Sequence, residues 1–129
     1  MLALDHGTVR IGVAVCDPTE TLCTPLPVIE PPEPASVVAL VREREVERVV
    51  VGLPIHLSGE EGSQAALART FADELTALLD VPVDTYDERL TSRMADASRR
   101  AGSKAARDSL AATHLLEAYL TSLARKGEA

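Results

Sequence analysis

Residues 2–15, LALDHGTVRIGVAV, predict two strands joined by a tight turn. An apolar run over Leu2–Leu4 predicts the first strand, a glycine follows at once, and Val9–Cys16 predict the second. Asp5 stands where the first run ends. A carboxylate at the mouth of a buried strand is costly unless something pairs with it, and a metal ion is one such partner. Asp5 is therefore the first candidate for a functional residue.

The composition predicts one domain over residues 1–129, with a core of Val, Leu, Ile and Ala because aromatic residues make up only 2%. No apolar run approaches the roughly 20 residues that cross a bilayer, and no cationic stretch leads into an apolar run near Met1. We therefore expect a cytoplasmic protein without a membrane partner. Cys16 and Cys23 are too few for a disulfide framework and match no zinc spacing, so both are expected to be reduced thiols.

The spacing of the apolar runs predicts a mixed sheet. A third strand is expected over Pro25–Ile29, and the gaps between the first three strands are too short for a crossover helix, so these strands should form an antiparallel meander. Two later strands each follow a helix and should run parallel to the first. These two strands are expected over Val49–Val51 and Val81–Tyr86. Helices are expected over Ala35–Glu45, from just after Ser58 to about Leu79, over Thr91–Ala101, and from Asp108 onward.

Two of these helices carry signals at their expected starts. Ser58 followed by Glu61 has the spacing of a capping box. Asp108 is expected in the first turn of the last helix, in register with its apolar stripe, so it should point at the sheet. The stripe consists of Ala112, Leu115, Leu116, Tyr119 and Leu123.

Acidic residues are expected to converge at one edge of the sheet. The carboxyl ends of parallel strands meet there, which brings Asp5 near Gly52-Leu53-Pro54 and Asp87-Glu88. Strand alternation puts Asp87 and Glu88 on opposite sides, so one of the two should face the site. Gathered carboxylates repel one another unless a cation joins them, and Mg²⁺ prefers oxygen ligands. Two such ions about 3.5–4 Å apart would support phosphodiester hydrolysis.

Each acid also has a purely structural interpretation. Asp5 could serve the turn before Gly7. Asp108 could be an N-cap or first-turn acid that interacts favourably with the helix dipole. The stretch Asp87-Glu88-Arg89 could be a solvated strand end with a local ion pair. It is the joint occurrence of the three acidic positions that favours a functional site.

The motifs together resemble the YqgF family, also called RuvX, of the RNase H-like superfamily. The matching stretches cover nearly the whole chain in family order: Leu4–Ala14, Val51–Pro54 with Gly59 and Gly62, Asp87–Ser92, and Asp108 with Ala111-Ala112 and Leu115-Leu116. The resemblance implies an RNase H-like α/β fold: a five-stranded sheet with strands 1–3 antiparallel, strands 4 and 5 parallel to strand 1, and helices on both faces. It also implies catalytic and metal-binding roles for Asp5, Glu88 and Asp108, with Asp87 as a less certain ligand of Mg²⁺ or Mn²⁺. Related resolvases place an acid on the fourth strand, where this chain has Gly52-Leu53. The resemblance therefore implies that Glu88 supplies the carboxylate that this strand lacks.

The charge of the chain bears on its partners. A net charge of −7 argues against broad, non-specific nucleic-acid binding. Basic residues nevertheless crowd the segment before Asp108, where they form either a solvated helical face or a guide for a nucleic-acid backbone. Arg10 could reach a phosphate or be a surface charge of an edge strand. The candidate nucleic-acid contacts are Arg10, Arg89, Arg99, Arg100, Lys104 and Arg107, with Arg93 in the same segment.

The leading hypothesis is a metal-dependent endonuclease acting on RNA. The resemblance implies hydrolysis of phosphodiester bonds in 5′-end maturation of pre-16S ribosomal RNA. Two alternatives stay open: a non-catalytic nucleic-acid-binding factor in transcription or ribosome assembly, and a nuclease for structured DNA similar to Holliday junction resolvases. A protein partner or a homodimer would supply affinity that an acidic chain lacks.

Overall fold

The computed structural model describes residues 1–17, 19, 22–55, 58–88 and 104–125, excluding the side chains of 104–106. The strands are β1 (Leu2–His6), β2 (Ile11–Cys16), β3 (Cys23–Ile29), β4 (Val49–Leu53) and β5 (Val83–Asp87), and the helices are α1 (Pro34–Glu43), α2 (Ser63–Leu78) and α4 (Lys104–Arg125). The helix expected over Thr91–Ala101 lies outside the described residues. Within the described ranges, none of the helices has both the length and the apolar character needed to cross a membrane.

The strands form one five-stranded sheet in the order β3-β2-β1-β4-β5. Antiparallel pairing joins β1 to β2 and β2 to β3, whereas β4 runs parallel to β1 and β5 parallel to β4. Residues 7–10 alone connect β1 to β2, which is too short for a crossover, while α1 and α2 precede β4 and β5 and allow the parallel pairings. The predicted meander and the predicted mixed sheet are both confirmed.

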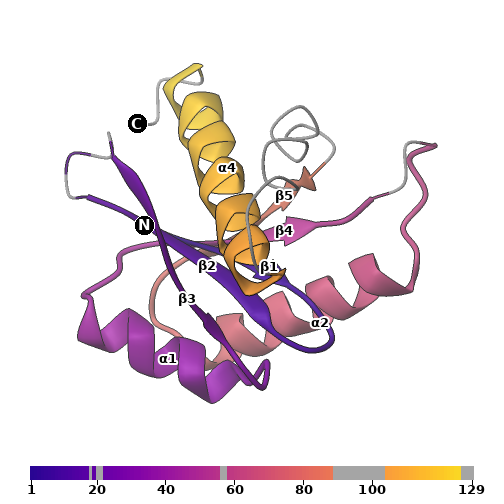
Figure 1. Cartoon of the computed structure of the whole chain (residues 1–129), viewed down its shortest axis with the longest axis horizontal. Helices are drawn as coiled ribbons and strands as arrows, with labels where there is room; N and C mark the ends of the chain where they lie inside the picture. The colour runs from indigo at the N-terminus through magenta and orange to yellow at the C-terminus, as the bar shows by residue number, and fades with distance from the viewer. Residues whose placement is uncertain (18, 20–21, 56–57, 89–103, 126–129) are drawn as a thin grey trace.

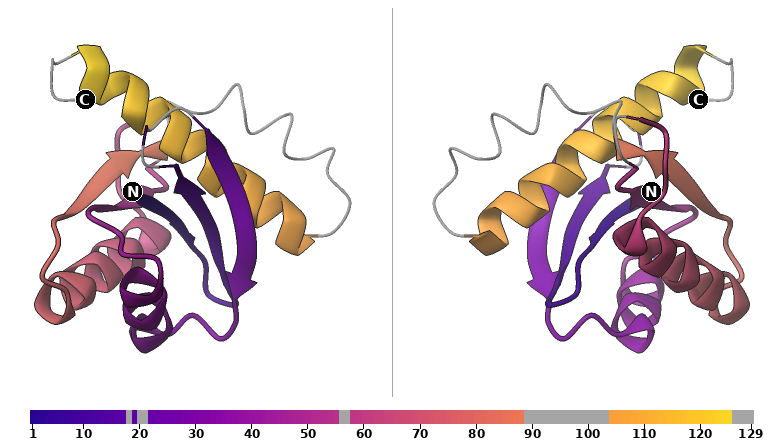
Figure 2. Two further views of the ribbon diagram at one scale, coloured as in Figure 1. Left: turned by 90° about the vertical axis from the view of Figure 1, so that its left-hand side faces the viewer. Right: turned by 90° about the vertical axis from the view of Figure 1, so that its right-hand side faces the viewer.

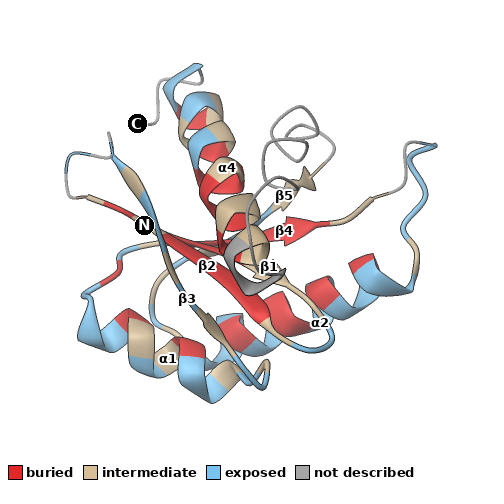
Figure 3. Cartoon of the chain, in the orientation of Figure 1, coloured by how far each residue is buried: buried red, intermediate tan, exposed pale blue. Residues whose placement is uncertain are grey.

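Helices cover both faces of the sheet. In Figures 1 and 2, α4 lies across one face, and α1 and α2 pack against the other. The central strands are buried between these layers (Figure 3), and Val49, Val50 and Val51 are each 0% exposed. The predicted stripe of α4 is buried throughout. Each large apolar side chain that is fully buried contributes about 1.5–3 kcal/mol, so these two layers supply the main driving force for folding.

A polar contact adds to the apolar packing of α4. The Tyr119 hydroxyl donates to a carboxylate oxygen of Asp84 in β5 and accepts a 3.2 Å hydrogen bond from Nη1 of Arg48. Its ring meets Tyr86 edge-on, with 5.7 Å between the ring centroids. Burial and the hydrogen bond to Asp84 raise the pKa of Tyr119 to about 12. These contacts fix the middle of α4 on the β4–β5 side of the sheet.

Both predicted helix starts are wrong. The N-cap of α2 is Gly62, with no side-chain capping bond, and Ser58 is exposed four residues earlier. Glu61 instead accepts a 2.8 Å hydrogen bond from Nε of Arg69, so its carboxylate is not available for a capping box. The last helix begins at Lys104, which places Asp108 one turn inside it rather than at its N-terminus. The interpretation of Asp108 as an N-cap is therefore wrong.

Candidate active site

The carboxyl ends of the three parallel strands form the expected edge. Asp5 lies in β1, Leu53 ends β4 opposite Asp87 of β5, and Glu88 follows directly. Asp5 shares the sheet face of Ala3, whose side chain packs beneath α4. The predicted meeting of these acids at one edge is what the fold produces.

Asp5 and Glu88 are hydrogen-bonded to each other. The pKa of Asp5 is raised well above its ordinary value, first by burial and then by the charge of Glu88, the shared hydrogen bond and the charge of Asp108. Burial also raises the pKa of Glu88, and the charge of Asp87 adds to this, while the bond from Asp5 acts in the opposite direction. Ionising both carboxyl groups at once is therefore unfavourable, because each is partly shielded from water and each carries a charge that acts on the other.

The choice between Asp87 and Glu88 is settled by strand alternation. Asp84 and Tyr86 both reach Tyr119 of α4, so the even-numbered residues of β5 face that helix. Glu88 lies just beyond the end of β5 and meets Asp5 on the same side, since its carboxyl group lies above Gly52 beside Leu115 of α4. Asp87 contributes a nearby negative charge that raises the pKa of Glu88.

Gly52 provides the space that the Glu88 carboxyl group occupies. A Cβ at this position would stand 2.5 Å from Oε1 of Glu88 and 3.0 Å from Cδ2 of Leu115. Gly52 thus explains how the site forms without an acid on β4: the carboxylate that reaches over this strand comes from the end of β5. Sequence reasoning missed this role, although the glycine after Val49–Val51 was a visible signal.

Asp108 approaches the same pair of carboxyl groups from α4. Its charge raises the pKa of Asp5, so the two acids lie within electrostatic reach. Its Oδ2 atom is 3.6 Å from Nη1 of Arg10, whose Nε is 3.4 Å from Oε2 of Glu30. The Arg10 side chain is only 19% exposed, so Arg10 links two acids at the margin of the site and is not a freely solvated surface charge.

The structure describes only some of the basic residues proposed to contact nucleic acid. Nε of Arg107, next to Asp108, is buried without a hydrogen-bond partner. Lys104 begins α4, but its side chain is not described. Arg89, Arg93, Arg99 and Arg100 lie outside the described residues.

The donor set suits a divalent cation, although the three acids are not yet arranged around one. Among the described residues, no group of three His, Cys, Asp or Glu side chains has a geometry that could hold a metal ion. Asp5 and Glu88 nevertheless offer buried oxygen ligands that repel each other when both are ionised, and a cation at that point would relieve the repulsion. Asp108 lies nearby with its carboxylate directed to Arg10.

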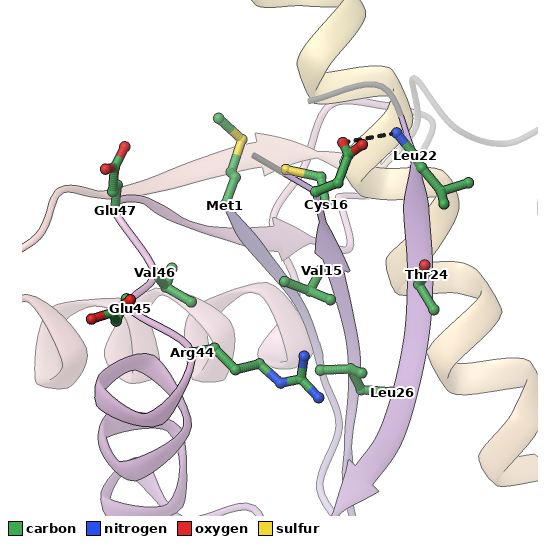
Figure 4. Close-up of a pocket in the computed structure, with 11 residues that line it drawn as sticks. Met1, Val15, Cys16, Leu22, Thr24, Leu26, Arg44, Glu45, Val46 and Glu47 are labelled. Carbon is green, nitrogen blue, oxygen red and sulfur yellow. Dashed lines mark hydrogen bonds between the residues drawn. The ribbon is translucent and has the colours of Figure 1, made fainter. Parts of the chain in front are cut away.

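A pocket of about 940 Å³ lies at the other end of the sheet (Figure 4). It is bordered by Met1, by the β2–β3 hairpin, and by the connection from α1 to β4. Asp17 is one of its lining residues, and its carboxylate accepts a 3.1 Å hydrogen bond from the Leu22 backbone amide. None of the predicted site residues lines this pocket, so the acidic edge remains the candidate site.

Comparison with known proteins identifies the family of the chain. The model of the RuvX family, described as a Holliday junction resolvase, matches residues 1–122. The chain belongs to the RuvX family. A Chloroflexus aurantiacus relative named "Putative pre-16S rRNA nuclease" is 46% identical, with 93% of this chain and 85% of the relative covered. A Roseiflexus relative of the same name is 39% identical, with 95% and 94% covered. The resemblance inferred from the motifs is confirmed.

Solved structures confirm the fold class. RuvC of Thermus thermophilus in complex with a Holliday junction substrate superposes with a TM-score of 0.60 at 18% identity, covering 95% of this chain and 97% of RuvC. A second structure of Thermus thermophilus RuvC gives a TM-score of 0.58 at the same identity. Membership of the RuvX family also sets the enzyme class, because the family is described as a resolvase and its members here are named nucleases. The chain is thus a nuclease, a hydrolase that cleaves phosphodiester bonds.

Proposed function

We propose that this RuvX protein is a divalent-metal-dependent endonuclease that acts on structured RNA in 5′-end maturation of pre-16S ribosomal RNA. The observation that carries the proposal is the half-buried, hydrogen-bonded pair of Asp5 and Glu88 with Asp108 within electrostatic reach. The names of the relatives support the choice of RNA. Cleavage in the cytoplasm follows from this substrate.

In this proposal Asp5, Glu88 and Asp108 are the metal ligands. Asp5 lies at the centre because it is hydrogen-bonded to Glu88 and also senses the charge of Asp108. Bound there, Mg²⁺ or Mn²⁺ would activate the attacking water and stabilise the leaving oxygen of the phosphodiester. Asp87, the neighbour whose charge acts on Glu88, would tune the affinity for the cation without contacting it.

The arginines beside the acids would hold the substrate. Arg10 is already oriented by Glu30 and Asp108, and its planar guanidinium suits a phosphate. The buried Nε of Arg107 lacks a hydrogen-bond partner that a phosphate oxygen could supply. Lys104, Arg89, Arg99 and Arg100 extend this set along the chain toward α4. Contacts through Arg10 and Arg107 beside Asp108 would let a chain of net charge −7 bind nucleic acid locally.

The decisive experiment compares Asp5→Asn with wild type. Purified proteins are incubated with a 16S precursor RNA and with a four-way DNA junction, in Mg²⁺, Mn²⁺ or EDTA. We expect metal-dependent cleavage of the RNA that falls at least about a hundredfold in Asp5→Asn, the scale seen when a central charge-stabilising group is removed. Asp73→Asn, on the exposed face of α2, is the matched control and should cleave like wild type.

Each other outcome selects a different function. Cleavage of the junction but not of the RNA would favour structured DNA, a candidate supported by the family description and by the fold shared with RuvC. RNA binding without any product would favour a non-catalytic factor. Equal cleavage by Asp5→Asn and wild type would show that the chemistry lies elsewhere.

A further inference from the structure

Ser109 is a buried polar residue that joins α4 to two strands. It is 4% exposed, and its Oγ donates a 2.6 Å hydrogen bond to the Leu26 carbonyl of β3. The same Oγ accepts a longer hydrogen bond, 3.5 Å, from the Val13 amide of β2. Buried hydroxyl groups are normally satisfied, but most helical serines bond within their own helix. Ser109 instead bonds to the sheet backbone.

The hydroxyl group enters the sheet where the β2–β3 ladder is irregular. Val13 pairs with Leu26, but the next pair is Ile11 with Ile29, so Pro27 and Val28 together stand opposite Gly12. This is the arrangement of a β-bulge, which locally disrupts the ladder. Ser109 bridges an amide and a carbonyl that face each other beside the bulge, and it thereby fixes α4 at this point of the sheet.

The bulge also lies beside the proposed metal ligands. Gly12, the residue opposite the bulge, pairs on its other side with Asp5. The main chain of α4 passes directly over Gly12: a Cβ there would collide with the Asp108 carbonyl oxygen and stand 3.1 Å from the Ser109 amide. Asp5 and Asp108 are therefore placed relative to each other through Gly12 and the Ser109 anchor.

We propose that Ser109 is a positioning residue for Asp108. Through its hydrogen bonds to Leu26 and Val13, Ser109 fixes the distance of α4 from the sheet and the rotation of the helix about its axis. Both determine where Asp108, the preceding residue, directs its carboxylate, so that it can reach Asp5 and Glu88. Ser109 itself would touch neither substrate nor metal. The proposal deepens the proposed nuclease function and depends on Asp108 being a ligand.

The test compares Ser109→Ala with Thr113→Val. Thr113 is a matched control because it is also buried in α4, at 7% exposure, but its hydroxyl group bonds the Ser109 carbonyl of its own helix at 2.9 Å. Both variants lose one buried hydroxyl group, and only the first loses an anchor to the sheet. The Mn²⁺ dissociation constant is measured by titration calorimetry, and unfolding in urea checks that both variants fold.

We expect Mn²⁺ binding to weaken about tenfold in Ser109→Ala, as is typical when a residue that orients a metal ligand is lost. Thr113→Val should stay within about twofold of wild type, and Ser109→Cys, which keeps the size and a weak donor, should recover part of the affinity. Equal affinities in Ser109→Ala and Thr113→Val would overturn the proposal.

A second measurement separates this proposal from the proposed function. Without metal, the effect of Asp108→Asn on unfolding is compared in wild type and in Ser109→Ala. If Ser109 positions Asp108 near Asp5 and Arg10, the effect of Asp108→Asn should be smaller in Ser109→Ala, so the two changes are not additive. Additive effects would refute the positioning role. Failure of wild type to bind Mn²⁺ would refute the metal site alone.

Discussion

The carbonyl group of Asp108 lies directly on Gly12, with no space between them for a side chain. This contact joins α4 to β2 at the residue that pairs with Asp5. Two acids separated by about a hundred residues in the sequence are thereby held near each other by backbone packing. The geometry of the site therefore depends on a glycine that contributes no chemistry.

Replacing Gly12 with alanine should move α4 away from the sheet. The new Cβ would overlap backbone atoms of Asp108, which cannot rotate away as a flexible side chain could. We expect a loss of about 2 kcal/mol or more in the free energy of unfolding, typical of overpacking, together with loss of nuclease activity. Urea unfolding and a cleavage assay provide the two measurements. Gly62→Ala, at an N-cap with φ of −86°, is the control and should cost only about 0.5–1 kcal/mol, with activity unchanged. Unchanged activity in Gly12→Ala would contradict the close approach.

Replacing Gly52 with alanine should act on activity more than on stability. The Cβ would stand 2.5 Å from a side-chain oxygen of Glu88, and this carboxyl group can turn away. We expect unfolding to cost about 1–2 kcal/mol, because the Leu115 contact is also tight, while the cleavage rate falls at least about tenfold. Steady-state kinetics at saturating metal would test this. A variant as active as wild type would show that Glu88 need not occupy the space above Gly52.

Asp5 should make the metal-free protein less stable as the pH rises. Its folded-state pKa is raised by burial and by Glu88 and Asp108, so the folded protein binds the proton more tightly than the unfolded chain does. The contribution of Asp5 is therefore most favourable below its unfolded pKa, near 3.9, and declines until the pH has passed the folded pKa. In EDTA near pH 7, Asp5→Asn should be more stable than wild type by on the order of 1 kcal/mol, and the difference should shrink toward pH 4. Urea unfolding across this range, with Asp73→Asn as the control, would reveal the trend or its reverse.

Divalent metal should make wild type more stable than Asp5→Asn, the reverse of the order expected in EDTA. A ligand that binds only the folded state stabilises it by an amount that grows with its concentration, about 2.7 kcal/mol at a hundred times the dissociation constant. Mn²⁺ should therefore raise the melting temperature of wild type and leave that of Asp5→Asn nearly unchanged. Differential scanning calorimetry at several Mn²⁺ concentrations measures both. Equal shifts in the two proteins would indicate that the metal binds elsewhere.

The thiol of Cys23 should be slow to react. Burial raises its pKa to about 11, and the charges of Glu117, Cys16 and Asp17 add to this. Because the thiolate is the nucleophile, alkylation of Cys23 in a Cys16→Ser variant at pH 8 should be about a hundredfold slower than that of a free cysteine. The rate should rise about tenfold per pH unit up to pH 10 without levelling off. A plateau near pH 9 would contradict the raised pKa.

Much of the fold could be predicted from local patterns. The short connections after β1 and β2 exclude crossovers, and the continuous apolar run of β4 requires burial on both faces, so both features hold whatever the details of packing. The position of Asp5 at the carboxyl end of β1 could also be predicted, because Asp5 directly follows the apolar run that forms this strand. The helix starts failed because capping signals are weak and compete with other partners, as the ion pair of Glu61 with Arg69 shows.

The sequence by itself determined the antiparallel meander of the first three strands, the parallel direction of the last two and the buried stripe of α4, because these depend on connection length and on residue periodicity. Only the tertiary structure decided that Glu88 rather than Asp87 meets Asp5, that Asp108 pairs with Arg10, and that Ser109 bonds Val13 and Leu26 beside the β2–β3 bulge. These contacts join residues far apart in the chain, and each requires space that a glycine or a bulge opens in another strand. No local pattern encodes that space, since it exists only once the helix and the sheet have packed together.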